Sequence, residues 1–290
     1  MLFTQRMAVS RVQARLQELS AELSSCLKVR EDFSPRRVHR LRTTIRRIDT
    51  LLSFAAAKFS KKQQSVLDEL AAVRKRAGKV RDLDVQIALL HEIANGSTVA
   101  DRRTVQELLT EKRQQHAAKL ASKARTFTSS RLFAHFKRMS ETLVRDNSVE
   151  TNPLREAEAR ISELRAHFDP GKKIKPRRLH TLRIELKSIR YLTELNEGSS
   201  ERDQLLERLK AVQNAIGSWH DWEQLTKTTK KRFSERSSCP LVQEMGALLA
   251  ARHSAALSAT AYFFSSSEAS TTRKPPQTAR RRMVLAQRAG

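Results

Sequence analysis

The chain has 290 residues and a formal net charge of +25, because 56 Lys and Arg outnumber 31 Asp and Glu. Such an excess implies a polyanionic partner, which is nucleic acid, polyphosphate or an anionic membrane surface. The apolar fraction of 39% allows a packed core, but no run of about 18 apolar residues is present that could cross a membrane. Gly and Pro are scarce, at seven each, so the composition is that of an all-α protein.

Apolar residues recur with helical spacing along most of the chain. We expect helices over residues 7–30, 35–58, 61–94, 100–127, 130–146, 154–168, 176–196, 200–233 and 240–263. A polar break at Asp146–Pro153 predicts that one helical domain, residues 1–265, has two halves of about 1–148 and 149–265. Residues 266–290 are rich in Ser, Thr, Pro and Arg, which predicts a disordered basic tail.

The second of these helices begins with a stretch that the chain uses twice. Residues 35–46 and 176–187 share Pro, Arg, Arg, His, Leu and Arg at equivalent places, 141 residues apart. Ser34 is expected to cap the first copy, since Pro35 suits the first position of a helix. At about 100° per residue, the cations of each copy fall on one face of the helix and the apolar residues on another. These cations are His39, Arg42 and Arg46 in the first copy and His180, Arg183, Lys187 and Arg190 in the second.

The cationic stripe has a simple structural explanation, because one side of an amphipathic helix normally faces water. Solvated faces usually mix Glu with Lys in supporting pairs, however. These stripes instead place like charges three, four and seven residues apart, which costs stability unless an anion relieves it. The pattern therefore favours an anion-binding site on the paired helices.

A second repeated segment follows each of these helices. Leu, Leu, Ala, Val, Gly and Asp recur 139 residues apart, so that Gly78–Asp82 matches Gly217–Asp221. The chain is therefore two copies of one unit.

The paired His-x-x-Arg helices, the Arg81-Asp82 pair after the glycine and the segment Lys187–Tyr191 resemble the CHAD domain, the conserved histidine α-helical domain. The resemblance covers roughly residues 5–265. It implies an all-α fold of two four-helix bundles, related by a pseudo-twofold axis, with a basic central cavity that binds inorganic polyphosphate. The chain departs from the family's pattern at Asp49, Ser188 and His220.

We expect the cations of the two repeated helices to bind polyphosphate without catalysis. The predicted contacts are His39, Arg42, Arg46, Arg47, Lys79, Arg81, His180, Arg183, Lys187, Arg190 and Lys210, with Arg36 and Arg177 as further candidates at the mouths of the helices. His39 and His180 should be mostly neutral among the arginines and should gain a proton beside an anion. A buried structural hydrogen-bond donor is the alternative role for each histidine.

Catalytic sites are not expected. HD-type metal phosphohydrolases need an Asp ligand after their His-Asp pair, and no Asp follows His220-Asp221. The sequence also has no glycine-rich phosphate loop, so we predict no cofactor, no metal and no catalytic residue. Asp82 and Asp221 are expected instead to brace neighbouring arginines or to cap a helix.

The alternative function is sequence-nonspecific binding of nucleic acid. Aromatic residues make up only 5% of the chain, and the basic helices lack interleaved Phe, Tyr or Trp. This argues against a platform that stacks single-stranded bases, but it leaves contacts with a duplex backbone open. A scaffold that assembles on polyphosphate is a third alternative.

Cys26 and Cys239 are isolated, which is typical of reduced thiols in a cytosolic protein, and the N-terminus has no apolar signal core. We therefore expect a cytoplasmic protein, with association with polyphosphate granules as a further expectation. The basic tail either adds affinity for a polyanion or is a solvated extension. The oligomeric state is not set by these patterns.

Overall fold

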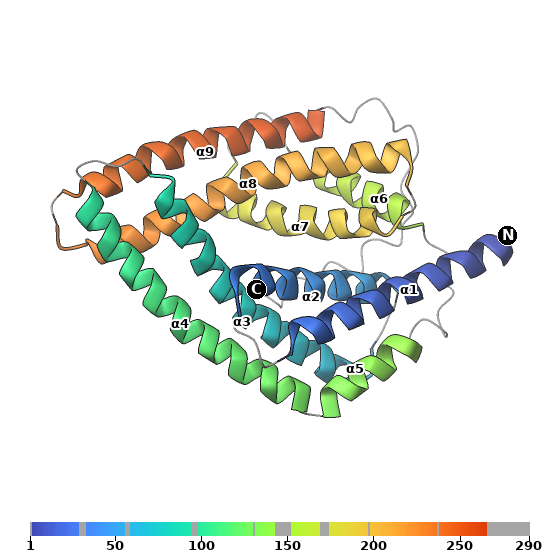
Figure 1. Cartoon of the computed structure of the whole chain (residues 1–290). Coiled ribbons are helices and arrows are strands. Elements are labelled where there is room, and N and C mark those ends of the chain that lie inside the picture. The colour runs from blue at the N-terminus through green and yellow to red at the C-terminus, as the bar shows by residue number, and fades with distance from the viewer. Residues whose placement is uncertain are drawn as a thin grey trace.

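The computed structural model describes residues 2–28, 33–55, 59–93, 98–129, 131–142, 152–168, 174–196, 198–236 and 238–265. Within these ranges all regular structure is helical, which confirms the predicted all-α class (Figure 1). The helices are α1 (Leu2–Cys26), α2 (Pro35–Ala55), α3 (Lys61–His91), α4 (Val99–Ser129), α5 (Arg131–Thr142), α6 (Pro153–Ala166), α7 (Pro176–Glu194), α8 (Ser200–Arg232) and α9 (Pro240–Ser265). In the same part of the chain, none of them is long and apolar enough to cross a membrane.

The helix starts follow local capping chemistry. Ser34 caps α2 as predicted, because its Oγ accepts a hydrogen bond from the backbone N–H of Arg37 at 3.4 Å. Ser60 and Gln63 form a capping box at α3, in which each side chain accepts from the other's backbone N–H. At α6 the Oδ1 of Asn152 accepts a hydrogen bond from the backbone N–H of Leu154 and so caps the helix, just before its first residue, Pro153. These local signals explain why the predicted starts of the helices lie close to the observed ones.

The first helix differs most from its expected bounds, since it runs over Leu2–Cys26 and not over residues 7–30. Its C-terminus is fixed by a side chain from α2. Arg37 Nε donates a hydrogen bond to the carbonyl oxygen of Cys26 at 3.0 Å, and its guanidinium also donates to the carbonyl of Lys28. These bonds satisfy carbonyls that the helix itself leaves without donors, so the chain turns at this point.

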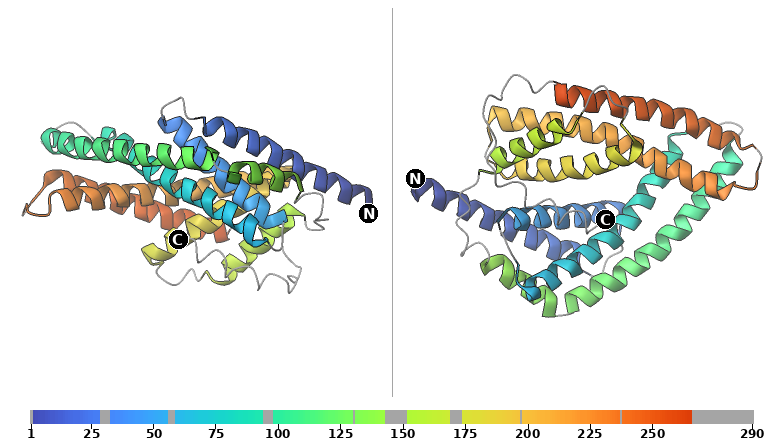
Figure 2. Two further views of the ribbon diagram at one scale, coloured as in Figure 1. Left: turned by 90° about the horizontal axis from the view of Figure 1, so that it is seen from below. Right: turned by 180° about the vertical axis from the view of Figure 1, so that it is seen from behind.

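Successive helices pack against one another in the same order in each half. In the first half α1 packs on α2, α2 on α3 and α3 on α4, and in the second α6 packs on α7, α7 on α8 and α8 on α9. Helix α5 packs against α1, α3 and α4 and has no equivalent in this second series. Between the halves, α2 packs on α7 and α3 on α8 (Figures 1 and 2). The two repeated helices predicted to carry the site are therefore neighbours in space.

Three clusters of buried apolar side chains hold the molecule together. One lies among α1–α5 and a second among α6–α9, with Phe54 of α2 as a member of the second. The third is shared by the two halves, and we call it the shared cluster. It joins the C-terminal ends of α3 and α8 to the N-terminal ends of α4 and α9, and its members are Leu83, Leu90, Ile93, Val105, Leu109, Trp222, Leu225, Phe233, Cys239, Leu241 and Met245.

The predicted boundary between the halves, Asp146–Pro153, lies mostly outside the described residues, as does the predicted tail, 266–290. The division at residue 148 therefore stays a prediction.

Candidate functional site

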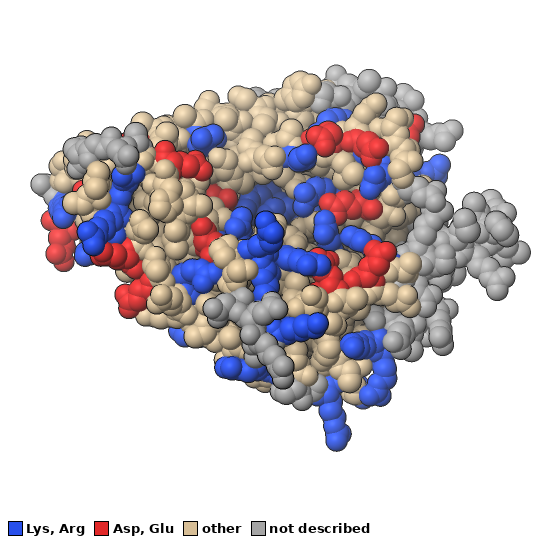
Figure 3. Space-filling model, in the orientation of Figure 1, with Lys and Arg blue, Asp and Glu red and all other residues tan. Residues whose placement is uncertain are grey.

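Cations from both halves converge where α2 faces α7. Lys and Arg side chains gather over the middle of the face in Figure 3, where α2 and α3 lie beside α7 and α8. Arg183 of α7 is close enough to lower the pKa values of Arg42 and Arg46 of α2 and of Lys187 on its own helix. The cationic cluster, as we call it, consists of His39, Arg42, Arg46, Arg81, His180, Arg183, Lys187 and His220.

Two glycines place the central arginines of the cluster. Arg42 Nε lies 3.5 Å from the position that a Cβ of Gly78 would occupy, and Arg183 Nε lies 3.7 Å from the equivalent position at Gly217. Arg42 therefore lies across α3 at Gly78, and Arg183 lies across α8 at Gly217. A single methyl would make ordinary contact there, but a longer side chain would occupy the path of the guanidinium. This gives a structural reason for a small residue at each of these two positions.

The acidic residue that follows each glycine supports the same arginine. Arg183 Nη2 is 3.7 Å from Asp221 Oδ1, so the predicted bracing role of Asp221 is confirmed. In the first copy, burial lowers the pKa of Arg42, and the charge of Asp82 is the largest influence that opposes this shift. Each half therefore contributes an arginine, a glycine and an aspartate in matching positions.

Lys187 is the most perturbed cation of the cluster. Burial lowers its pKa to about 6, and the positive charges of Arg183, Arg42 and Arg46 act in the same direction against the weaker opposing charge of Asp221. Arg46 is affected in the same way, and its pKa falls to about 10. Burial of like charges therefore leaves Lys187 largely neutral near pH 7, ready to take up a proton when an anion arrives.

The histidines of the cluster are neutral near pH 7, as expected. Burial lowers the pKa of His180, and then the charge of Arg183 lowers it further. The His220 ring lies 4.7 Å from the His180 ring, and burial lowers the pKa of His220 to about 3. His39 is exposed, but partial desolvation and Arg81 lower its pKa as well. His220 was not predicted as a site residue; its place just before Asp221, in the repeated segment, was the available signal.

Several buried polar atoms of the cluster have no hydrogen-bond partner. Arg46 Nε, Arg183 Nε, His180 Nδ1 and His220 Nδ1 form no hydrogen bond within the described part of the chain. Buried polar atoms are normally satisfied, so the unsatisfied Nε donors of the two arginines favour a ligand with acceptor oxygens. Among the same residues no group of three or more His, Cys, Asp or Glu could hold a metal ion.

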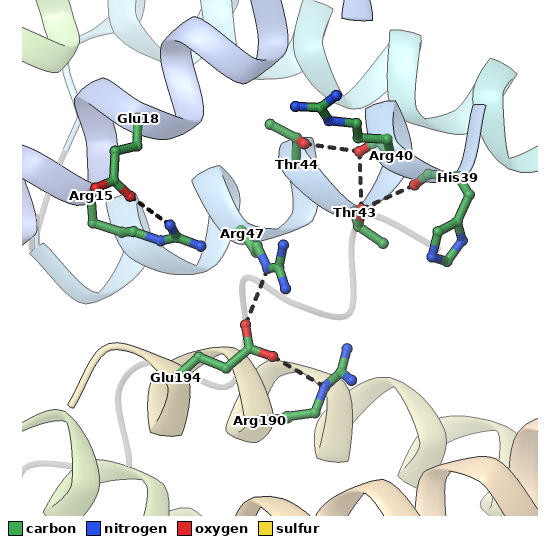
Figure 4. A network of polar contacts seen from close by, with 9 residues as sticks. All are labelled: Arg15, Glu18, His39, Arg40, Thr43, Thr44, Arg47, Arg190 and Glu194. Carbon is green, nitrogen blue, oxygen red and sulfur yellow. Dashed lines mark hydrogen bonds and ion pairs between the residues drawn. The ribbon is translucent and has the colours of Figure 1, made fainter. Parts of the chain in front are cut away.

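Two further predicted contacts, Arg47 and Arg190, are held by a carboxylate that the sequence analysis did not identify. Figure 4 shows Glu194 of α7 between them: Arg47 Nε lies 3.1 Å from Glu194 Oε2, and Arg190 Nε lies 3.7 Å from Glu194 Oε1. Both guanidinium groups also lie over the Tyr191 ring, at 5.8 and 5.1 Å from its centre. This Glu194 bridge ties α2 to α7 beside the cationic cluster.

The remaining predicted contacts lie elsewhere on the helices. Lys79 is exposed and lies beside His116 of α4, where its charge lowers the pKa of that histidine. Lys210 is exposed and lies 3.5 Å from Glu207 of its own helix. Arg36 and Arg177 are exposed in the first turns of α2 and α7.

A hollow of about 750 Å³ lies between the end of α3 and the first half of α4, apart from the cationic cluster. It is lined by Leu90, His91, Val99, Arg102, Arg103, Gln106, Glu107, Thr110, Glu111 and Gln114. None of these residues was predicted to belong to the site.

The chain belongs to the CHAD domain family, because the model of that family matches residues 10–230. The crystal structure of the CHAD domain from the plant Ricinus communis has the same fold, with a TM-score of 0.66 and 18% sequence identity over 89% of this chain and 91% of that chain. PptA from Streptomyces chartreusis is also similar, with a TM-score of 0.59 and 15% identity over 89% of this chain and 98% of that chain. No curated protein is significantly similar in sequence. The resemblance found in the repeated motifs is thus confirmed.

Proposed function

We propose that this protein binds inorganic polyphosphate in the cationic cluster, without hydrolysing it. The observation that carries the proposal is the convergence of half-buried, like-charged side chains from both copies of the repeat, with Arg42 and Arg183 electrostatically coupled across α2 and α7. Such an arrangement costs stability unless a polyanion neutralises it. A linear polyphosphate carries about one negative charge per phosphate and acceptor oxygens along its whole length.

We further infer that α1–α4 and α6–α9 act as two four-helix bundles around a basic central cavity. Two observations support this arrangement. The helices of each series pack in the same order, and the contacts of Arg42 with Gly78 and of Arg183 with Gly217 are equivalent in the two halves. A ligand placed between the bundles would meet one guanidinium from each.

The side chains of the cluster would have distinct roles toward a phosphate chain. Arg42 and Arg183 present planar guanidinium groups that can donate two parallel hydrogen bonds to phosphoryl oxygens. Asp221 keeps Arg183 oriented, and Lys187 gains a proton as the anion approaches. Release of the ions condensed on polyphosphate adds a salt-dependent contribution to the affinity.

Nucleic acid is the competing ligand, and a direct competition decides between the two. We expect long-chain polyphosphate to displace duplex DNA when both are present at equal charge concentration and physiological salt. The arginines at the centre of the cluster are partly buried between helices, so a thin chain reaches them more easily than the backbone of a wide duplex. Equal or stronger retention of DNA on the protein would overturn the polyphosphate proposal.

Loss of either central arginine should weaken binding to one shared site. Arg42→Ala or Arg183→Ala is expected to reduce affinity for a short, defined polyphosphate by about 1–3 kcal/mol, the scale of a hydrogen bond to a charged group. The double variant should deviate from the sum of the two, because both residues contact one chain. Titration calorimetry should give a stoichiometry of one in the wild type.

The matched control is Arg103→Ala, which removes an exposed cation of α4 that pairs with Glu107. It should leave the affinity for the short chain nearly unchanged. A second binding event that persists unaltered after Arg42 is removed would show two separate sites, in disagreement with a shared one.

A further inference from the structure

A second group of cations lies outside the cationic cluster, along the line where α3 packs on α4. Ion pairs mark its limits on α3: Lys123 Nζ lies 2.6 Å from Glu69 Oε2, and Arg113 Nε lies 2.6 Å from Asp84 Oδ1. Along this line α3 presents Arg76 and Lys79, and α4 presents Lys112, His116 and Lys119. We call these five residues the α3–α4 seam.

His116 is the point at which the seam converges. Burial lowers its pKa, and the charges of the four surrounding Lys and Arg side chains then lower it further. Its Nδ1 is buried and has no hydrogen-bond partner in the described structure. In the described part of the chain, no carboxylate forms an ion pair with any of the four Lys and Arg side chains of the seam. Uncompensated charge on two packed helices is the feature that requires an explanation.

The seam is not part of the duplicated site. At the offset of 139 residues, Arg76 corresponds to Ala215 and Lys79 to Ser218, which are uncharged. Helix α9, which packs on α8 as α4 packs on α3, has Arg252 as its only Lys or Arg. The first half therefore has a cationic surface between these two helices that the second half lacks.

The seam and the cationic cluster lie on different sides of the same helix, α3. Gly78, which contacts Arg42, directly precedes Lys79, and successive residues of a helix point about 100° apart. Helix α3 thus has Gly78 and Arg81 toward the cluster and Arg76 and Lys79 toward α4. A flexible anionic chain that leaves the cluster needs only to cross α3 to meet the seam.

We propose that the α3–α4 seam is a second contact for long polyphosphate, which holds the part of the chain that extends beyond the cationic cluster. This proposal rests on the proposed function and adds a preference for long chains. The seam consists of four exposed or half-buried Lys and Arg side chains around His116, without Phe, Tyr or Trp, so it suits a phosphate backbone better than a stack of bases.

The test compares a short, defined polyphosphate with a long chain, using the full-length protein. The double variant Arg76→Ala/Lys79→Ala should bind the short chain as the wild type does. Its affinity for the long chain should fall by about tenfold, and the salt dependence of that affinity should flatten by about one to two counterions, because two phosphate contacts are lost. The matched control is Lys230→Ala/Lys231→Ala, which removes two exposed cations near the end of α8.

Three results would overturn the proposal. These are an unchanged affinity for the long chain, equal losses for short and long chains, and a loss of duplex DNA binding while long polyphosphate binding is retained. Arg42→Ala, measured in parallel, separates this proposal from the proposed function. If Arg42→Ala leaves the short chain bound as in the wild type, the cationic cluster is not the site, whatever the seam variant does. If only Arg42→Ala acts, the cluster binds and the seam does not.

Discussion

Replacing Lys187 by Met is expected to stabilise the protein in the absence of a ligand, although most substitutions at a packed position destabilise. The ammonium group lies among Arg183, Arg42 and Arg46, and its pKa falls from 10.5 to about 6 on folding. Met has a similar length and no charge. We expect the free energy of unfolding at about pH 7.5 to rise by about 2–4 kcal/mol, the cost of keeping this amine unprotonated in the folded state.

The pH dependence of stability tests the same explanation. Between pH 6 and 10.5, the unfolded chain holds a proton on Lys187 that the folded chain has released. Stability must therefore rise with pH across this window, since it rises wherever the unfolded state binds more protons. Denaturant unfolding from pH 6.5 to 9 should show this rise in the wild type and a weaker one in Lys187→Met. The control Lys210→Met, at an exposed position, should change stability by less than about 0.5 kcal/mol. A Lys187→Met protein that is less stable than the wild type would contradict the argument.

Binding of polyphosphate is expected to weaken as the pH rises, by up to about 100-fold between pH 7 and 9. An anion beside Lys187 favours its charged form, so binding should take up as much as one proton per site. For each proton taken up on binding, the association constant falls by about tenfold for every unit by which the pH rises. The same proton linkage governs the pH dependence of stability. Arg46, whose pKa falls to about 10, keeps most of its charge up to pH 9 and so contributes little to the change.

Calorimetry measures the proton uptake directly. Titrations with one short polyphosphate, in buffers with different ionisation enthalpies, should show proton uptake near pH 8 for the wild type and much less for Lys187→Met. Because histidines also gain a proton beside an anion, the difference between the wild type and Lys187→Met, and not the pH of the measurement, isolates the proton taken up by Lys187. Equal proton uptake by the two proteins would show that another group takes up the proton.

The helices could be predicted from the sequence because their determinants are local. Pro35 and Pro176 begin α2 and α7 as expected, and the apolar spacing fixes the faces that these helices bury. The repeat also placed equivalent cations on both helices. Their convergence needed a further fact, that α2 packs on α7. Long-range packing between the halves is not encoded in the period of either helix.

The contacts that the sequence analysis missed depend on the direction of a side chain and on its partner on another helix. Lys79 was grouped with the repeated motif, but one step along α3 from Gly78 turns it toward His116 of α4. Glu194 lies beyond the repeated stretch of α7, so its contact with Arg47 of α2 could not be read from spacing along one helix. Such positions depend on two helices at once, and only the folded arrangement defines them.

The shared cluster has a mechanical consequence for the cations. Repulsion between the arginines of α2 and α7 acts to push the halves apart. The shared cluster, with Trp222 and Leu225 buried against α3 and α4, opposes that force, and so does the Glu194 bridge between α2 and α7. The work of bringing like charges together is thus done by the apolar core during folding. A polyanion then meets cations already held at a set spacing, so little of its binding energy is spent on ordering them.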